Sequence, residues 1–387
     1  MQTVKGRWFG AGHSAAPDSV KAGAEAVATA LGGRTAKAVF VFCSTGHDLT
    51  ALLAAVRSEA GPAAEIIGCT TLGELSSTGG ATLGSVAVIA LGGDGFTVRT
   101  RAAQVGAHGH RAAGADVAAA MTGMDRPYTT LMLLCDGLTG DPHEVVRGAY
   151  SVLGAAVPLV GGFSGDDHGS RRSFQFQGDQ VLSGAVVGIA LGSDAPLGVG
   201  IAHGWQRTEP AMVATRSDGG RVFELDGEPA LDVLLRRRGA ATAADLFEGD
   251  ASLLALGLSR RNGEDIRVLH GGDENDRSLL ASAPVPQEAV CWLMDSEYQA
   301  MIGGAAQSCA QAVDALGGAA PLGVFTFDCG GRRGELGPDG TREEVAAIRG
   351  VVGGAVPFGG FYTMGEVARV RGSSGAHALT LVTLALA

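Results

Sequence analysis

The sequence predicts an α/β protein of two domains, built from repeated strand-helix-strand units on mixed, largely parallel sheets. At 387 residues, the chain is longer than most single hydrophobic cores require. Three segments (residues 38–75, 131–167 and 322–367) share one order of features: an apolar run ending in cysteine, a polar loop with glycine, a helical pattern and a second apolar run. Strand-helix-strand units normally close right-handed with parallel strands, so each segment should form one such unit.

Each segment contains a local helix signal. Asp48 is a predicted N-cap, followed by apolar residues at helical spacing. Asp141 precedes Pro142, and proline suits the first position of a helix. Thr341 and Glu344 have the spacing of a capping box. A further apolar run follows each segment and predicts one more strand per unit: residues 84–91, 184–192 and 377–386.

The domain boundary is predicted near residue 215. Residues 1–215 would hold the first two units, and residues 216–387 would hold the third unit with a small antiparallel part. The acidic turn GGDENDR, Gly271 to Arg277, lacks the spaced ligands and terminal glutamate of a calcium-binding loop. It is therefore interpreted as a solvated turn.

Composition argues against several classes of protein. The formal net charge of −11 is unfavourable for binding nucleic acid or an anionic membrane. The N-terminus lacks the apolar core of a signal peptide, and the apolar C-terminal run is too short to span a bilayer. A cytoplasmic protein is expected. The six cysteines form no CxxC pair, which argues against a zinc site and predicts reduced thiols.

Parallel strands would bring the polar ends of each unit to one edge of its sheet. Open α/β sheets bind ligands at this edge, beside helix N-termini. Glu74 and Glu366 follow glycine in equivalent loops, where a carboxylate could pair with a ligand ammonium group. The alternative is that each carboxylate only accepts hydrogen bonds from its own loop. The predicted ligand-binding residues are Cys43, Thr71, Glu74, Asp136, Asp166, Cys329, Arg332, Tyr362, Thr363 and Glu366.

Three cysteines, Cys43, Cys135 and Cys329, are expected to end equivalent strands. Buried packing is the simpler interpretation of each. The alternative is a thiol that faces the ligand or, for Cys329, a nucleophile whose pKa Arg332 would lower. His203, in GIAHGW, is interpreted either as a structural residue or as an axial ligand of a non-covalent haem, since the sequence has no CxxCH motif.

Six separated phrases resemble the FIST family, a group of bacterial sensory domains: IIGCTTLGEL, PLVGGFSGDD, GIAHGW, ELDGEPALDVL, FTFDCGGR and VPFGGFYTMGEV. The resemblance runs from about Val39 to the C-terminus and covers the N-terminal and C-terminal FIST domains. It implies a sensor of small ligands, amino acids among them; some members are described as haem-binding nitric oxide sensors. No kinase, chemoreceptor, cyclase or F-box segment accompanies the phrases, so the expected partner is a separate signalling output protein.

Three hypotheses of function follow. The first is a cytoplasmic sensor that binds an amino acid or a similar small polar metabolite, with no certain cofactor. The second is a nitric oxide sensor that binds haem b through His203. The third is a cysteine-dependent enzyme that acts on a small metabolite through Cys329 or Cys135. The sequence has no nucleophile elbow, Walker loop or dinucleotide fingerprint, so enzymatic activity is the less favoured hypothesis and stays open.

Overall fold

The computed structural model describes residues 6–248, 253–260, 263–369 and 375–387. The chain divides into two compact units. Unit 1 comprises residues 1–202, 302–376 and 380–387, and unit 2 comprises residues 203–301 and 377–379. The third repeat thus lies in one unit with the first two, so the compact units do not follow the sequence division at residue 215.

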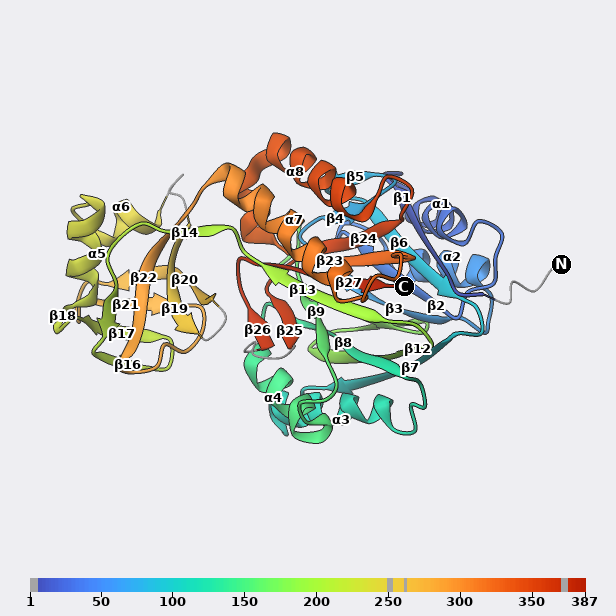
Figure 1. The fold of residues 1–387 in the computed structure, drawn as a ribbon, viewed down its shortest axis with the longest axis horizontal. Coiled ribbons are helices and arrows are strands. Elements are labelled where there is room, and N and C mark those ends of the chain that lie inside the picture. The colour runs from blue at the N-terminus through green and yellow to red at the C-terminus, as the bar shows by residue number, and fades with distance from the viewer. Residues whose placement is uncertain (1–5, 249–252, 261–262, 370–374) are drawn as a thin grey trace. The chain divides into compact units, whose positions relative to one another are not determined.

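Within the described residues, unit 1 contains three sheets, whose labelled strands are drawn in Figure 1, and the three sheets have the same strand order. An edge strand is followed by the last strand of a repeat, then by its first and second strands, and finally by a hairpin from another repeat. Sheet 1 consists of β1 (Trp8–Ser14), β6 (Val86–Gly92), β2 (Ala38–Cys43), β3 (Glu65–Thr70), β10 (Gln175–Gln177) and β11 (Gln180–Leu182). Sheet 2 consists of β7 (Phe96–Gln104), β12 (Ala185–Ser193), β8 (Tyr128–Asp136), β9 (Leu159–Ser164), β25 (Glu366–Arg369) and β26 (Gly375–His377). Sheet 3 consists of β13 (Leu197–Ala202), β27 (Leu381–Leu386), β23 (Gly323–Cys329), β24 (Phe358–Thr363), β4 (Glu74–Ser76) and β5 (Gly80–Thr82).

The crossover hairpins link the three repeats in a ring. The first repeat adds β4 and β5 to sheet 3, the second adds β10 and β11 to sheet 1, and the third adds β25 and β26 to sheet 2. Each sheet therefore needs strands from two repeats. This exchange is the physical reason that the third repeat cannot form a separate compact unit.

The expectation of largely parallel sheets is wrong. Among the described strand pairs, the parallel ones are β2 with β3, β8 with β9, and β23 with β24. These are the strand-helix-strand pairs that the sequence predicts. The strands that follow each unit return in the opposite direction, so the neighbouring pairs are antiparallel.

Two helices pack on one face of each sheet. Sheet 1 packs with α1 (Ser19–Leu31) and α2 (Leu49–Ala60), sheet 2 with α3 (Gly109–Ala118) and α4 (Pro142–Leu153), and sheet 3 with α7 (Tyr298–Asp314) and α8 (Gly330–Val352). The short 3-10 helix η1 (Ala119–Met121) follows α3. The other faces share one central core, in which Phe40 and Phe325 rings lie 4.8 Å apart and Phe42 stacks on Phe361 at 4.6 Å. Burial on both faces explains the continuous apolar strands.

The predicted helix starts are confirmed in the first two repeats. The Asp48 side chain accepts from the Ala51 N–H, and the Asp141 side chain accepts from the Glu144 N–H. The third prediction is wrong. Helix α8 begins directly after Cys329, is interrupted at Gly337, where φ is 62°, and places its predicted capping-box residues inside the helix.

In its described residues, unit 2 is an antiparallel sheet with two short helices. The sheet contains β14 (Trp205–Arg207), β22 (Ala289–Ser296), β19 (Leu254–Arg260), β20 (Gly263–Asp273), β21 (Ser278–Ala281), β17 (Arg221–Leu225) and β16 (Arg216–Asp218), with β15 (Met212–Ala214) on β22 and β18 (Glu228–Pro229) on β17. Helices α5 (Ala230–Arg238) and α6 (Ala243–Phe247) contribute to the same apolar core as the sheet.

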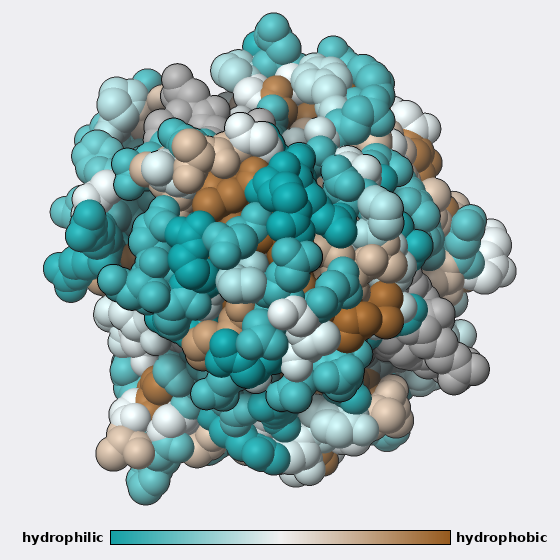
Figure 2. Space-filling view, turned by 90° about the vertical axis from the view of Figure 1, so that its left-hand side faces the viewer, coloured by the Kyte–Doolittle hydropathy of each residue, from teal (hydrophilic) through white to brown (hydrophobic). Residues whose placement is uncertain are grey.

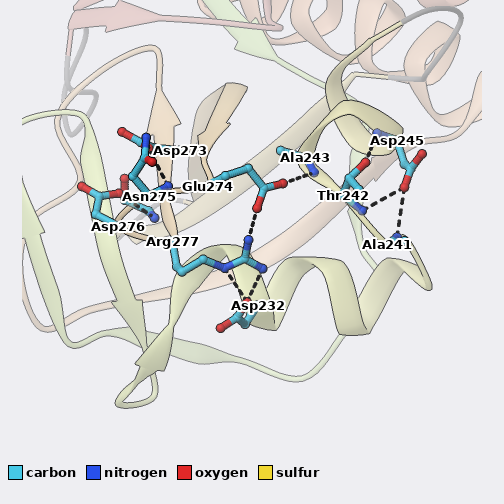
Figure 3. A network of polar contacts seen from close by, with 11 residues as sticks. Asp232, Ala241, Thr242, Ala243, Asp245, Asp273, Glu274, Asn275, Asp276 and Arg277 are labelled. Carbon is cyan, nitrogen blue, oxygen red and sulfur yellow. Dashed lines mark hydrogen bonds and ion pairs between the residues drawn. The ribbon is translucent and has the colours of Figure 1, made fainter.

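The acidic turn between β20 and β21 is solvated, as predicted, with Glu274, Asn275 and Asp276 exposed, and it also contacts both helices (Figure 3). Glu274 accepts a hydrogen bond of 2.8 Å from the Ala243 N–H at the start of α6. Arg277 forms ion pairs with Glu274 and with Asp232 of α5. Arg221 contacts two aspartates of the turn. The acidic side chains therefore hold both helices against the sheet.

The surface offers no broad apolar face in the view of Figure 2, which shows mostly hydrophilic residues with small hydrophobic patches. Within the described residues, the large exposed apolar side chains are Val20, Leu83, Tyr128, Leu138, Val152, Val290 and Met364. None of the helices in this part of the chain has the length and apolarity that crossing a membrane would require.

Candidate functional site

Strand register makes Glu74, Gln175 and Glu366 equivalent positions. Each is the first residue of a crossover hairpin, and each side chain is fully buried. The sequence pattern predicted the two glutamates in accessible loops at a sheet edge. They are buried because each hairpin enters the sheet of another repeat. Their partners across the strand pairs are Phe361 for Glu74, Cys69 for Gln175 and Gly162 for Glu366.

Protein groups occupy both oxygens of the Glu74 carboxyl group. Oε1 lies 2.6 Å from the Thr71 hydroxyl, and Oε2 accepts from the Ser85 N–H at 3.1 Å and from its hydroxyl at 2.6 Å. Burial raises the pKa of Glu74 to about 8, although the hydrogen bonds from Ser85 and Thr71 act to lower it. These contacts match the alternative interpretation, in which the carboxyl group pins its own loop.

Glu366 repeats the same arrangement. Its Oε1 contacts the Thr363 hydroxyl, and Oε2 accepts from the Thr380 N–H at 3.1 Å and from the Thr380 hydroxyl at 2.7 Å. Burial again raises the pKa of the acid to about 8, against the hydrogen bonds from both threonines. Thr71 and Thr363, both predicted as ligand-binding residues, therefore serve these two glutamates.

A second buried cluster surrounds Arg332. Its Nε donates to Asp328 Oδ1 at 2.8 Å, and its Nη2 donates to Glu344 Oε1 at 2.5 Å. The Tyr362 hydroxyl donates to Glu344 Oε2 at 3.3 Å. All four side chains are fully buried. Burial and the nearby Asp328 carboxylate raise the pKa of Glu344 well above its usual value. With Glu344 protonated, the positive charge of Arg332 is balanced by the negative charge of Asp328.

The six cysteines are all free and buried. In each repeat, one residue of the first strand pairs with a glycine of the second strand (Gly68, Gly161 or Gly360). Two positions further along the first strand, the three repeats have Cys43, Cys135 and Asp328, respectively. The expectation that Cys329 is equivalent to Cys43 and Cys135 is therefore wrong by one residue. Burial raises the pKa of the Cys43 and Cys135 thiols well above the ordinary range.

Of the two predicted aspartates, Asp136 is the last residue of β8, and Asp166 lies in the loop that follows β9. Asp136 accepts hydrogen bonds from the hydroxyls of Thr139 at 2.8 Å and Ser173 at 2.7 Å. Burial opposes its ionisation, but these bonds lower the pKa of Asp136. Asp166 accepts from the Thr45 hydroxyl at 2.5 Å, which joins the loops of the first and second repeats.

The structure thus brings the predicted residues together in small groups rather than in one site. Thr71 contacts Glu74, Thr363 contacts Glu366, and Arg332 is joined to Tyr362 through a glutamate that the sequence analysis treated only as a helix cap.

A pocket of about 770 Å³ opens at the other end of sheet 1, beside the amino ends of β2 and β3. Its walls carry two basic residues, two acidic residues and two aromatic rings. These are Arg34, Lys37, Glu65, Asp94, Trp8 and Phe96. None of these residues was predicted from the sequence as part of a site. The sequence feature that could have indicated this pocket is the pair of basic residues in the segment GGRTAK, before the first predicted strand.

Contacts with the protein hold several of these side chains in place. The Arg34 guanidinium lies over the Trp8 ring, 4.1 Å from its centre, and its Nε donates to the Leu31 carbonyl at 2.9 Å. The Lys37 ammonium donates to the Phe96 carbonyl at 2.7 Å. Burial lowers the pKa of Arg34, which remains a cation at any physiological pH. The pocket therefore presents pre-positioned positive groups.

Glu65 and Asp94 supply the negative side of the pocket. Glu65 accepts a hydrogen bond of 2.8 Å from the Thr100 hydroxyl, while Asp94 is exposed. The wall charges balance, with two cations and two anions. Such a wall can receive a ligand that carries both signs of charge.

The geometry of His203 does not fit an axial haem ligand. Its Nδ1 accepts a hydrogen bond of 2.9 Å from the Trp205 N–H, and its Nε2 lies 3.7 Å from Glu264 Oε2. An iron atom would have to displace one of these contacts. Among the described residues, no group of three or more His, Cys, Asp or Glu side chains is arranged to hold a metal ion.

Comparisons with known proteins confirm the predicted family. Two uncharacterized proteins of Mycobacterium tuberculosis are each 29% identical to this chain over 399 residues, covering 96% of this chain and 97% of each relative. A solved structure titled as a cyanuric acid hydrolase covers 98% of this chain and 100% of its own, with 13% identity and a TM-score of 0.36, which is too low to support an argument. Residues 37–228 match the FIST N domain and residues 230–369 match the FIST C domain. The chain therefore belongs to the FIST family.

Proposed function

We propose that this protein is a cytoplasmic sensory protein that binds an amino acid or a similar small polar metabolite in the pocket beside Arg34 and Lys37. The signal would pass to a separate output protein. The observation that carries the proposal is the pocket, whose volume of about 770 Å³ lies within the usual size of small-molecule sites. Family membership supports a sensory role.

The pocket chemistry suits a zwitterion. A ligand carboxylate would lie against the guanidinium of Arg34 and the ammonium of Lys37, and a ligand ammonium group would face Glu65 or Asp94. Trp8 and Phe96 offer apolar surface for the rest of the ligand. Because Arg34 and Lys37 are already held by Leu31 and Phe96 carbonyls, little side-chain entropy is lost on binding.

The test is a calorimetric titration of the purified protein with each amino acid, preceded by a thermal-shift screen. Lys37→Met keeps the aliphatic stem and removes the charge, so it should weaken binding by about 10-fold or more, since a hydrogen bond to a charged group is worth about 1.5–3 kcal/mol. Arg34→Gln should act in the same direction.

Lys21→Met is the matched control. Lys21 is an exposed lysine on α1, outside the pocket, whose contact is an ion pair with Glu25. Its substitution should leave the affinity unchanged. If a ligand binds and Lys37→Met and Arg34→Gln both retain full affinity in folded protein, the pocket is not the site. If no small polar metabolite binds, the proposed function fails.

A further inference from the structure

The three equivalent positions at the crossover hairpins carry two glutamates and one glutamine in the same hydrogen-bonding environment. Gln175 Nε2 donates to the Ser164 hydroxyl at 2.7 Å, and its Oε1 accepts from the Ala185 N–H at 3.2 Å. Glu74 and Glu366 likewise place one oxygen against a threonine hydroxyl and the other against a backbone N–H group at the start of the next strand.

The glutamine copy shows where the hydrogens lie. An amide nitrogen only donates, so Gln175 donates to Ser164, whose own hydrogen can go to the Cys135 carbonyl or to the Ser173 hydroxyl, each at 2.9 Å. In the first repeat, the Thr71 hydroxyl lies 3.4 Å from the Cys43 carbonyl, the equivalent acceptor. A protonated glutamate can form the same two hydrogen bonds, with its O–H in place of the N–H, and the hydroxyl of Ser85 or Thr380 adds a further donor to its other oxygen.

We propose that Glu74 and Glu366 are neutral carboxylic acids in the folded protein, each donating its proton to Thr71 or Thr363, and that Gln175 is a permanent neutral copy of the same group. The two acids are then a pair of proton-binding sites at the hairpins that join the repeats. Loss of either proton would leave a buried negative charge at a crossover between sheets, and would loosen that crossover.

The charges around both acids favour this assignment. Among the described residues neither glutamate forms an ion pair, and a buried carboxylate without a cation is costly. The titratable groups that face Glu74 are Asp167, Cys43 and Cys69, with His13 reached only through the hydroxyls of Thr82 and Ser85. Asp328 faces Glu366. A negative Asp167 or Asp328 further disfavours the ionised acid, and burial raises the pKa of each glutamate to about 8.

The direct test is infrared spectroscopy of the full chain with glutamate labelled by ¹³C, which separates the carbonyl absorption of protonated glutamate from that of ionised glutamate. The wild type should show protonated glutamate at pH 6.5, and the part of this signal that comes from Glu74 and Glu366 should disappear through about pH 8. Glu74→Gln and Glu366→Gln should each remove one proton equivalent from this signal. The double variant should retain only the contribution of Glu344.

Gln175→Glu is the reverse substitution. It places an acid at the third equivalent position, near the Asp136 carboxylate. It should add a proton equivalent to the infrared signal. Chemical unfolding gives a second readout. Between about pH 5 and pH 8 the unfolding equilibrium constant should rise by about 10-fold per pH unit for each protonated acid. That pH dependence should weaken in each Glu→Gln variant and strengthen in Gln175→Glu.

The direction of this pH dependence of stability follows from the raised pKa of each acid. A folded acid with a pKa of about 8 contributes stability below its unfolded value of about 4.3, and loses it as pH rises to about 8. The proposal is overturned if the labelled wild type shows both glutamates ionised at pH 6.5. It is also overturned if Glu74→Gln and Glu366→Gln leave the protonated signal unchanged. A wild-type spectrum without protonated glutamate at pH 6.5 refutes the proposal by itself, so a variant that fails to fold does not rescue the idea.

Discussion

Removing the cation of the buried Arg332 cluster should cost more stability than any other single charge change considered for this chain. In Arg332→Met, the Asp328 carboxylate loses its ion pair and Glu344 loses a hydrogen bond, while both side chains remain fully buried. Deleting one partner of a buried ion pair costs about 3–5 kcal/mol, because the remaining charge is uncompensated. This is a large part of the roughly 5–15 kcal/mol by which folded domains are stable.

Glu344→Gln is the informative comparison. Burial and the neighbouring Asp328 raise the pKa of Glu344, so the group already behaves as a neutral acceptor for Arg332 and Tyr362. Replacing it by glutamine should change the free energy of unfolding by about 1 kcal/mol or less, the usual net value of one neutral hydrogen bond.

Urea unfolding at pH 7 and at pH 5 measures both variants. The loss in Arg332→Met should be smaller at pH 5, because protonating a carboxylate that lacks a cation removes the buried charge. Two results would refute the reasoning: a loss below about 1 kcal/mol in Arg332→Met, or an equal loss in Glu344→Gln. Either would mean that the cluster is solvated or that its proton is placed differently.

The remaining predictions concern backbone packing and thiols. Gly360→Ala should not fold, because a Cβ atom there would lie 1.7 Å from the Thr326 carbonyl oxygen of the paired strand, while Gly354→Ala, with open space at its Cβ, should fold normally by circular dichroism. A folded Gly360→Ala would show that β23 and β24 can separate. A thiol reagent should label no cysteine of the native protein within minutes and all six after unfolding, since every thiol is buried. Burial raises the pKa of Cys291 and Cys309 to about 12, so raising the pH to 9 should not change this result. Rapid native labelling of one thiol would contradict this prediction and would favour the hypothesis of a cysteine-dependent enzyme.

The steric clash that a Cβ atom would cause at Gly360 also indicates the role of this glycine. The same close approach recurs at Gly68 and Gly161, where a Cβ would lie 1.8 Å and 2.1 Å from the carbonyl oxygens of Val41 and Leu133. The paired glycines of VPLVGGF and VPFGGF therefore include one in each repeat that serves strand packing. A bulky substitution at Gly360 tests folding rather than ligand binding.

The sequence by itself determined the local structure and the family. The helix starts at Asp48 and Asp141 follow from hydrogen bonds between a side chain and a backbone group three residues away, which sequence spacing encodes directly. The parallel pairing within each repeat follows from the strand-helix-strand order. Six phrases in order were enough to identify the FIST family, which the domain matches confirm.

Only the tertiary structure decided which edge each hairpin joins, and with it the position of the predicted site residues. Glu74 and Glu366 have the sequence signature of an exposed polar loop, and they are buried because hairpins from one repeat complete the sheet of another. Backbone hydrogen bonds carry no information about which strand will be the partner, since every free edge offers the same groups. The pocket beside Arg34 was missed for the same reason, because its walls come from segments that meet only when β1, β2, β3 and β6 are side by side.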